Sequence, residues 1–273
     1  MKTYSDITIH HPFSSSVQKE KYLLSYNGQY YEASHAIVEL VEELQRYEEE
    51  KAAIEAYVRK KEGKYTPEQV REVIEKFIDP IFRAVPKKRS FLYEKELFSA
   101  GAIDRFSDTF RFLFHKAYMM VVLVGMLALD TWFFFTTSDL LLFNNKVNIY
   151  MVAGLLVFML ASSFFHELGH ASACKYFGVR HGGIGFGLYL NFPVLYTDVT
   201  EVWKLNRAQR CVVNLAGVYF QSYWLIALLV AFLITGNDIL RYLILIMNLG
   251  FVMTLNPFFK FDGYWIASDL LGV

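Results

Sequence analysis

Apolar residues gather in long runs in the second half of the chain, whereas the first half alternates short apolar and charged stretches. Four of these runs reach the roughly 17–25 residues that a transmembrane helix requires. They lie at approximately 117–136, 147–166, 211–235 and 240–261. The pattern therefore predicts a mainly α-helical membrane protein with about four transmembrane helices.

The residues before the first apolar run predict a small α/β domain. Strand-forming residues flank Asn27-Gly28, a dipeptide typical of two-residue β-hairpin turns. Ser34 can then cap a helix. The apolar face of this helix is expected to contain Ile37, Leu40, Val41 and Leu44, which recur at helical spacing.

Two more helices complete this domain. One is expected at about 50–61, and the other begins after Thr66, which can form a capping box with Gln69. The residues of this third helix expected to be buried are Val70, Val73, Ile74 and Phe77. A hairpin followed by three helices gives the domain a winged-helix-like outline.

Aromatic and charged residues alternate between Phe91 and Phe114, which is typical of an amphipathic stretch lying at a membrane interface. We therefore predict three parts along the chain. They are a cytoplasmic domain at 1–90, an amphipathic interfacial connector at 91–114 and a transmembrane core at 115–273.

The chain carries 27 basic and 27 acidic residues, and a net charge of zero argues against a nucleic-acid partner. Basic residues concentrate in the loop between the second and third apolar runs, at Lys175, Arg180, Lys204, Arg207 and Arg210. The positive-inside rule places this loop, the N-terminal domain and both termini in the cytoplasm. The first residues also lack an apolar core of signal-peptide length, so the N-terminal domain is expected to stay on the side of synthesis.

The second apolar run ends in the sequence "FFHELGHASA", at a depth where ionisable residues are rare and usually functional. His166 and His170 are four residues apart, so on a helix both can present a ring nitrogen to one metal ion. Zinc suits such ligands and, with three of them, keeps a fourth position for water. Glu167 is expected to act as the general base for the zinc-activated water. The alternative is an interfacial cluster that merely reaches toward water.

A third protein ligand for zinc must come from another part of the chain. The candidates are Asp130, His181, Asp198, Asp262 and Asp269. Asp262 is favoured because it follows an apolar run and a helix break at Asn256-Pro257, which is tolerated at membrane depth only beside protein or water. Its alternative role is a helix cap beside Gly263.

The sequences "HELGH" near the end of one span and "NPFFKFDG" near the end of a later one resemble the site-two protease family of intramembrane zinc metalloproteases. The resemblance covers roughly residues 115–273. It implies zinc ligands at His166, His170 and Asp262, and a catalytic base at Glu167. It also implies that "GIGFGLYLNFPVLYTDV" forms a membrane-associated β-hairpin region and that "LAGVYF" contains a glycine turn opening the next core span.

The chain departs from this family at positions thought to hold the substrate backbone. Many members have asparagine where this chain has Thr254, with Asn256 two residues later, and asparagine is common where this chain has Gln221. We therefore expect Asn256 and Gln221 to bind substrate. Gly185 and Gly187 are expected to join them, because flexible, strand-forming backbone beside the site can pair with an extended peptide.

The sequences "PVLYTDVTEVWKLNRAQRCVVNLAG" and "NPFFKFDGYWIASDLLG" are similar to membrane metalloproteases found beside ribosomally made, modified peptides. The N-terminal domain resembles the leader-binding domain of those pathways, the RiPP recognition element, on "NGQYYEAS" and "IVELVEEL". The resemblance implies that a leader peptide adds a strand to the hairpin edge near Tyr30 and Tyr31. It also implies a bacterial cytoplasmic membrane, an ABC-type exporter as a partner, and a short or truncated member, since relatives usually continue past "SDLLG".

Three functions follow from these residues. The leading one is a zinc endopeptidase that cleaves a small ribosomally made peptide or its leader. The second is a regulatory intramembrane protease that releases a membrane-tethered signalling protein, although the sequence shows no PDZ-type domain to favour it. The third is a non-catalytic peptide-binding or export partner, and Glu167 counts against it because a structural metal site needs no general base.

Overall fold

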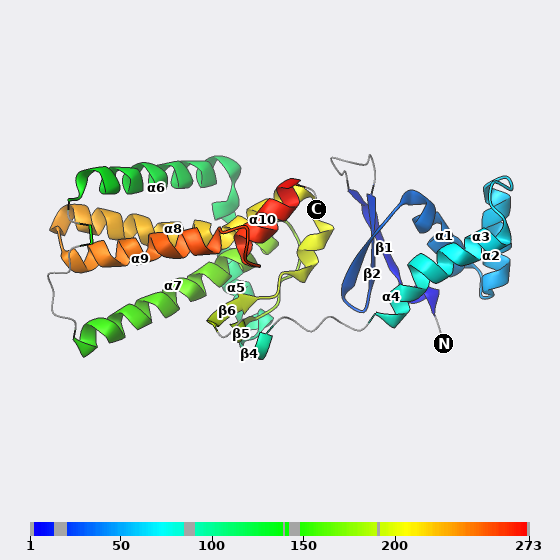
Figure 1. Ribbon diagram of the computed structural model, residues 1–273, viewed down its shortest axis with the longest axis horizontal. Helices are drawn as coiled ribbons and strands as arrows, with labels where there is room; N and C mark the ends of the chain where they lie inside the picture. The colour runs from blue at the N-terminus through cyan, green and yellow to red at the C-terminus, as the bar shows by residue number, and fades with distance from the viewer. Residues whose placement is uncertain are drawn as a thin grey trace. The chain divides into compact units, whose positions relative to one another are not determined.

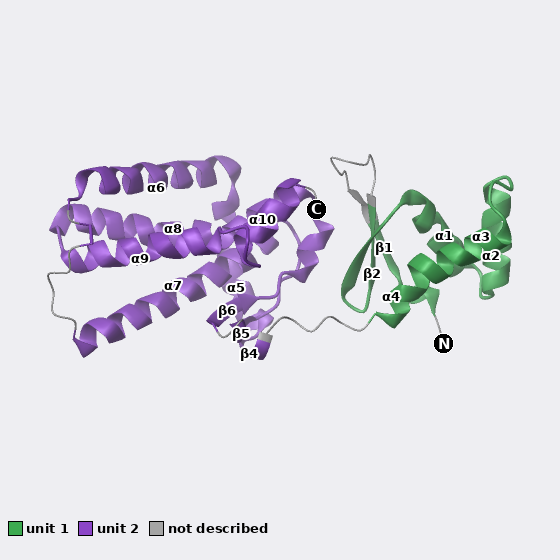
Figure 2. Ribbon diagram, in the orientation of Figure 1, with its two compact units in different colours: residues 1–89, 272 green, residues 90–271, 273 purple. Residues whose placement is uncertain are grey.

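The computed structural model describes residues 3–13, 21–84, 91–138, 140–141, 148–189 and 192–271. The chain divides into two compact units, unit 1 with residues 1–89 and unit 2 with residues 90–271 (Figure 1, Figure 2). Helices predominate, and each unit contains one small antiparallel sheet and its own hydrophobic core.

The sheet of unit 1 has three antiparallel strands in the order β1-β2-β3. They are β1 (Thr8–Phe13), β2 (Lys21–Tyr26) and β3 (Gln29–Ala33). Asn27 and Gly28 join β2 to β3 with φ angles of 47° and 73°, the left-handed backbone that a type I′ turn requires. The predicted hairpin is therefore confirmed. The sequence did not predict β1, because the histidines and the proline in "TIHHPF" hide its strand pattern.

Four helices follow the sheet of unit 1: α1 (His35–Arg46), α2 (Glu50–Lys60), α3 (Pro67–Val73) and α4 (Asp79–Arg83). Ser34 occupies the N-cap position of α1, as predicted. The capping box of α3 is also present, because the Thr66 hydroxyl accepts the backbone N–H of Gln69 and the Gln69 side chain accepts that of Thr66. Apolar residues of the strands and of these helices form one core.

A π-helical turn at Ile74–Ile78 changes which side chains the third predicted helix buries. Val70 and Ile74 are buried as expected, but Phe77 is 50% exposed and Ile78 is fully buried instead. The prediction for Phe77 is wrong because a π turn adds one residue per turn and rotates the side chains that follow it.

Unit 2 contains the long apolar helices. They are α6 (Lys116–Thr136), α7 (Ile149–Tyr176), α8 (Arg207–Thr235) and α9 (Asp238–Thr254), with the shorter α5 (Ala100–Phe110) and α10 (Asp262–Leu271) near one end. The helix α8 is central, since it packs against α6, α7, α9 and α10 (Figure 1). Asn206 and Gln209 form a capping box at its start, and Gly236 ends it in the left-handed conformation.

Three of the described helices, α6, α7 and α8, are long and apolar enough to cross a bilayer. The apolar windows of α6 and α7 are only 11% and 6% buried, so their apolar surface faces outward, as lipid contact requires. The fourth predicted span differs from the expected range, because α9 has 17 residues, about 25 Å, and ends at Thr254 rather than near 261. Three described helices that can cross a bilayer indicate a membrane protein, and the fourth span stays a prediction.

The sheet of unit 2 consists of β4 (Phe91–Phe98), β5 (Ile184–Tyr189) and β6 (Phe192–Thr197), in the order β4-β5-β6. The pairing of β5 with β6 is the β-hairpin that the family resemblance implied. The region 91–114, whose place at a membrane interface stays a prediction, contains two kinds of element. Its first part is the strand β4, and only its second part, α5 with the 3₁₀ turn Arg111–Phe114, is helical. The strand was missed because its sheet partners follow more than eighty residues later.

Candidate metal centre

The two histidines of the HELGH sequence lie one turn apart on α7, and Asp262 is the first residue of α10. His166 Nε2 is 3.1 Å from His170 Nε2 and 3.1 Å from Asp262 Oδ2. His170 Nε2 is 3.3 Å from the same carboxylate oxygen. The structure therefore brings together the three residues that the sequence predicted as zinc ligands, in a group whose candidate ligand atoms converge.

The spacing of these three atoms fits one metal ion. Ligands about 2.0 Å from a tetrahedral zinc lie about 3.3 Å from one another. Asp262 Oδ2 is buried and accepts no hydrogen bond from the described residues. A buried carboxylate oxygen facing two imidazole nitrogens is costly without a positive charge among them. The donor set of two imidazoles and one carboxylate is one that zinc accepts, with a fourth position left open.

The other ring nitrogens of both histidines are hydrogen-bonded to α8. His170 Nδ1 donates to the backbone carbonyl of Val213 at 2.8 Å, and His166 Nδ1 donates to Gln221 Oε1 at 3.2 Å. Both acceptors are oxygen atoms, so the proton resides on Nδ1 and the Nε2 lone pair faces the cluster. Metal-binding histidines are commonly held in their tautomer and orientation in this way.

One face of α8 supplies these contacts at four-residue spacing, from Val213 through Gly217 to Gln221. Gly217 lies against the His166 ring, because a Cβ atom added there would be 2.3 Å from its Nε2 and Cε1 atoms. Gly169 allows a similar approach of α7 to α8, since a Cβ on it would be 2.4 Å from the carbonyl oxygen of Ala216. The glycine turn implied by the family resemblance is wrong, because Gly217 lies inside the continuous helix α8. Its missing side chain leaves space for the His166 ring.

Asp262 reaches the cluster because the chain turns sharply after α9. The side chain of Asn256 accepts the backbone N–H of Phe258 at 2.9 Å, which starts this turn around Pro257. A Cβ atom on Gly263 would be 2.1 Å from the carbonyl oxygen of Leu255, so the start of α10 packs directly on the end of α9. These contacts return the chain to α7 within a few residues.

The charge state of Asp262 suits a metal ligand. Burial disfavours a charged carboxylate at this position, but attraction to the His170 and His166 rings in their protonated form outweighs this effect and holds the pKa of Asp262 well below its usual range; a bound metal ion would supply the same positive charge. The carboxylate is therefore ionised at neutral pH, which is the form that binds a metal.

Glu167 is adjacent to the three ligand candidates without belonging to them. Its side chain is 7% exposed, and its charge interacts with the imidazole of His170. The backbone carbonyl of Glu167 accepts the hydroxyl of Thr197 at 3.3 Å, which joins this turn of α7 to the end of β6. A buried carboxylate next to the ligands has the position expected of a general base.

The remaining candidates for the third ligand have other partners. Asp130 accepts a hydrogen bond from the Asn248 amide at 2.9 Å between α6 and α9. Asp198 accepts the backbone N–H of Thr200 at 3.0 Å, and Asp269 accepts the Arg210 Nε–H at 2.7 Å. None of these three aspartates belongs to the ligand group found among the described residues.

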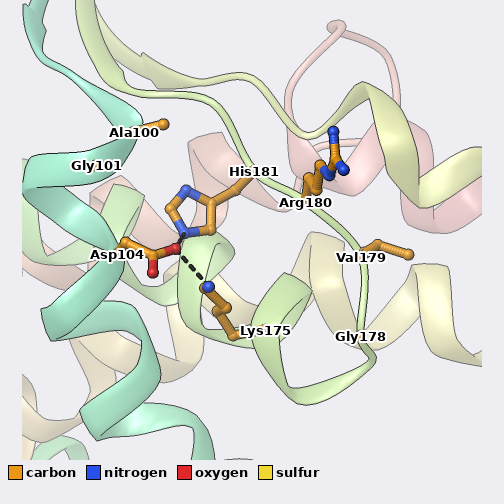
Figure 3. Close-up of a pocket in the computed structure, with 8 residues that line it drawn as sticks. All are labelled: Ala100, Gly101, Asp104, Lys175, Gly178, Val179, Arg180 and His181. Atoms are coloured by element: carbon orange, nitrogen blue, oxygen red, sulfur yellow. Dashed lines mark ion pairs between the residues drawn. The ribbon is translucent and has the colours of Figure 1, made fainter.

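His181 lies in a second polar cluster beside a cavity of about 460 Å³ (Figure 3). Its Nε2 is 2.9 Å from the buried hydroxyl of Ser107, and its Nδ1 donates to the carbonyl of Gly182 at 2.8 Å. Figure 3 shows Asp104, Lys175 and His181 pointing toward one another, with an ion pair between Lys175 and Asp104. The hydrogen bond from Lys175 lowers the pKa of Asp104. The cluster therefore connects α5 to the end of α7 and leaves His181 no part in the metal centre.

The expected substrate-binding residues occupy different environments. Gln221 contacts His166, and Asn256 shapes the turn before α10. Gly185 and Gly187 lie on β5, the middle strand, where they are paired with β4 on one side and β6 on the other. Their role with substrate stays a prediction, and the strand edges of this sheet belong to β4 and β6.

Sequence reasoning missed several residues that support the centre. Ser162 and the carbonyl of Val213 contact Gln221 and His170, and Arg210 binds Asp269. One signal was available: Ser162 precedes His166 by four residues, as His166 precedes His170, so the three share a helix face. No local pattern reveals the carbonyl of Val213, because any residue supplies a carbonyl.

No protein-family model matches the chain, and no solved structure matches it. Among curated proteins, it is similar to "Putative peptide zinc metalloprotease protein YydH" of Bacillus subtilis (strain 168), with 29% identity over 125 residues. The matched region is 40% of this chain and 49% of that protein, so the chain spans about half the length of the curated relative that it matches. This distant similarity supports a relationship to zinc metalloproteases.

Proposed function

We propose that the protein is a membrane-embedded zinc metalloendopeptidase of the site-two protease type. The observation that carries the proposal is the convergence of His166 Nε2, His170 Nε2 and Asp262 Oδ2 within 3.3 Å of one another, with Glu167 beside them. Three protein ligands with an open fourth position are typical of catalytic zinc sites, whereas structural sites are closed by four.

The chemistry that zinc supplies when bound is Lewis acidity toward the scissile carbonyl and the attacking water. The chain's own residues supply the rest. The Glu167 carboxylate accepts the proton of the attacking water, and the resulting carboxylic acid returns it to the departing amine. Val213 and Gln221 hold the two imidazoles by their Nδ1–H groups, so that neither ring has to reorient during the reaction.

The sheet of unit 2 supports an extended peptide as the substrate. Its edge strand β6 ends at Thr197, whose hydroxyl contacts the backbone of Glu167. A peptide strand that adds to this edge lies alongside the turn of α7 that carries the metal motif, with its carbonyl groups near the centre. In this proposal Gly185 acts indirectly, because a Cβ on Gly185 would be 2.5 Å from the Tyr196 ring of β6.

Unit 1 supports a ribosomally made peptide or its leader as the substrate class. Its strand β3 lies at an edge of the described sheet, where a leader peptide can add as a fourth strand. Tyr31 packs against the core of unit 1, and Tyr30 lies on the opposite face of β3, so a leader peptide on the outer face would lie beside Tyr30. The proposal includes a bacterial cytoplasmic membrane, a cytoplasmic active site and cooperation with an ABC-type exporter.

The proposal is tested by zinc content per chain in detergent-purified protein, for wild type, Glu167→Gln, His166→Ala, Asp262→Ala and the control Asp130→Asn. We expect one zinc in wild type, Glu167→Gln and Asp130→Asn, and loss of zinc in the two ligand variants. Peptide cleavage should require Glu167 even though zinc binding does not. Full zinc retention by Asp262→Ala, or a wild type without zinc, contradicts the proposal. The non-catalytic peptide-binding alternative is favoured if wild type and Glu167→Gln bind zinc and peptide equally and wild type cleaves no peptide.

A further inference from the structure

The side chain of Gln221 on α8 contacts two polar residues of α7, His166 and Ser162. Its Oε1 accepts the Nδ1–H of His166 at 3.2 Å, and its Nε2 donates to Ser162 Oγ at 2.9 Å. Ser162 is 4% exposed and lies one turn before His166 on α7. Gln221 therefore bridges two positions of α7 from α8.

Both ends of the Gln221 amide are engaged within the protein, which leaves it poorly placed to bind a substrate backbone. The orientation of the amide also has a physical reason. If the amide were reversed, its NH₂ group would face His166 Nδ1, and the ring proton would have to move to Nε2. That proton would then point at His170 Nε2 and Asp262, which lie 3.1 Å away. The observed orientation is the one that keeps the Nε2 lone pair toward the cluster.

We infer that Gln221 and Ser162 are positioning residues that fix the tautomer and ring orientation of His166 for metal binding. Gln221 holds the Nδ1 proton of His166, and Ser162 holds Gln221 in the orientation that accepts this proton. Gly217 supports the same ring from the α8 backbone. This inference rests on the proposed zinc function and deepens it, because it moves Gln221 from substrate binding to ligand positioning.

The two histidines are held by different means. His170 donates to a backbone carbonyl, which no substitution removes, whereas His166 depends on a side chain. Of the two Nδ1–H contacts, only that of His166 can therefore be removed by substitution of its acceptor. Partners of this kind typically change metal affinity by about 10–100-fold when they are removed.

The test measures the zinc dissociation constant of the full chain in detergent, by competition with a chelator. The variants are Gln221→Met, which keeps the length of the side chain without its polar atoms, Gln221→Glu, which keeps the acceptor, and Ser162→Ala. The matched control is Ser222→Ala, because among the described residues the hydroxyl of Ser222 bonds only to the carbonyl of Tyr219 in its own helix. Cobalt-loaded protein gives a second reading, since its visible absorption spectrum reports the ligand geometry.

We expect Gln221→Met to weaken zinc binding by about 10–100-fold and to change the cobalt spectrum. Gln221→Glu should have a zinc affinity and a cobalt spectrum closer to those of wild type. Ser162→Ala should weaken zinc binding less than Gln221→Met does, and Ser222→Ala should change neither the affinity nor the spectrum. Unchanged zinc affinity and an unchanged cobalt spectrum in Gln221→Met overturn the inference, and a raised KM with unchanged zinc affinity returns Gln221 to substrate binding. A wild type that binds no zinc contradicts the proposed function itself, whereas zinc binding that does not depend on Gln221 contradicts only the positioning role.

Discussion

Arg210 and Asp269 form a buried ion pair that joins the start of α8 to α10, with the guanidinium Nε 2.7 Å from the carboxylate Oδ1. The two side chains are 6% and 9% exposed. Arg210 also donates to the carbonyl of Leu205 at 3.2 Å, and its guanidinium carbon lies 5.0 Å from the centre of the Trp203 ring. Because α10 begins with Asp262, this pair fixes the helix that carries the third candidate ligand.

Asp269→Ala is expected to destabilise the protein and to weaken zinc binding, although Asp269 is not a ligand. Removal of one partner of a buried ion pair costs about 3–5 kcal/mol, because the other charge is left without compensation. Thermal unfolding and zinc affinity of the detergent-purified protein measure the two effects. Asp108→Ala is the control, since its pair with Arg111 is more than half exposed and should contribute less than about 1 kcal/mol. Equal effects of the two substitutions would contradict the role given to Asp269.

Gly217→Ala is expected to lower zinc affinity at least about 10-fold, because the added methyl group displaces the His166 ring. It should also reduce the free energy of unfolding by about 1–3 kcal/mol through overpacking. Gly154→Ala is the matched control on α7, where a Cβ meets nothing within 4 Å and a better helix former is introduced. Chelator competition measures the zinc affinity of both variants, and wild-type affinity in Gly217→Ala would contradict close packing of Gly217 against the His166 ring.

The stability of unit 1 is expected to depend on pH through Glu39. A hydrogen bond from Lys61 Nζ, at 2.5 Å, is the main cause that lowers the pKa of Glu39. A carboxylate whose pKa is lower in the folded state stabilises that state above its unfolded pKa, about 4.3, and loses this contribution as the pH falls through the folded value. Glu39→Gln should therefore reduce hydrogen-exchange protection in α1 and α2 at pH 7 but have little effect near pH 3.

The matched control for this pH dependence is Glu42→Gln, at an exposed position of the same helix. It should leave the protection of α1 and α2 nearly unchanged at both pH values. A loss of protection in Glu39→Gln that is as large at pH 3 as at pH 7 would show that packing, and not the charge of Glu39, is responsible.

Tyr30 and Tyr31 are expected to differ in their effect on stability. The ring of Tyr31 packs against the core of unit 1 and its hydroxyl donates to Gln29 at 2.6 Å, whereas the ring of Tyr30 lies 5.8 Å from that of His10 on β1. Tyr31→Ala should lower the free energy of unfolding of unit 1 by about 1–3 kcal/mol, and Tyr30→Ala should lower it by less than about 1 kcal/mol. Hydrogen exchange of the β2–β3 hairpin measures both, and comparable losses would mean that Tyr30 cannot be used to test leader binding separately from folding.

The sequence predicted the elements that depend on local patterns. The turn at Asn27-Gly28, the capping box at Thr66 and the three long apolar helices all follow from residues close together in the chain. The convergence of the three candidate ligands was predictable for a related reason, because the spacing of His166 and His170 defines one helix face, and Asp262 carried its own family motif. The sequence placed the end of the second span at 166, but α7 continues to Tyr176 because its helical pattern does not stop where the apolar run does.

Features that depend on distant partners were not predicted. The strand β4 has charged residues and becomes a strand only by pairing with β5. Gln221 contacts Ser162 and His166 on another helix, which the sequence did not show, so the family resemblance alone led to the expected substrate contact. The exposure of Phe77 depends on one π turn, which an apolar repeat cannot distinguish from a regular helix.

In the proposed protease, the length of α7 bears on how water reaches the scissile bond. The helix has 28 residues, about 42 Å, whereas the hydrocarbon core of a bilayer is about 30 Å thick. A helix that enters the hydrocarbon at Ile149 leaves it after about 20 residues, near Leu168 and between the two histidines. Bulk solvent then supplies the reaction directly at the membrane surface. Under the proposed function, water then reaches Glu167 without crossing the lipid, and a peptide that never crosses the bilayer can approach Glu167 from the same side as the water.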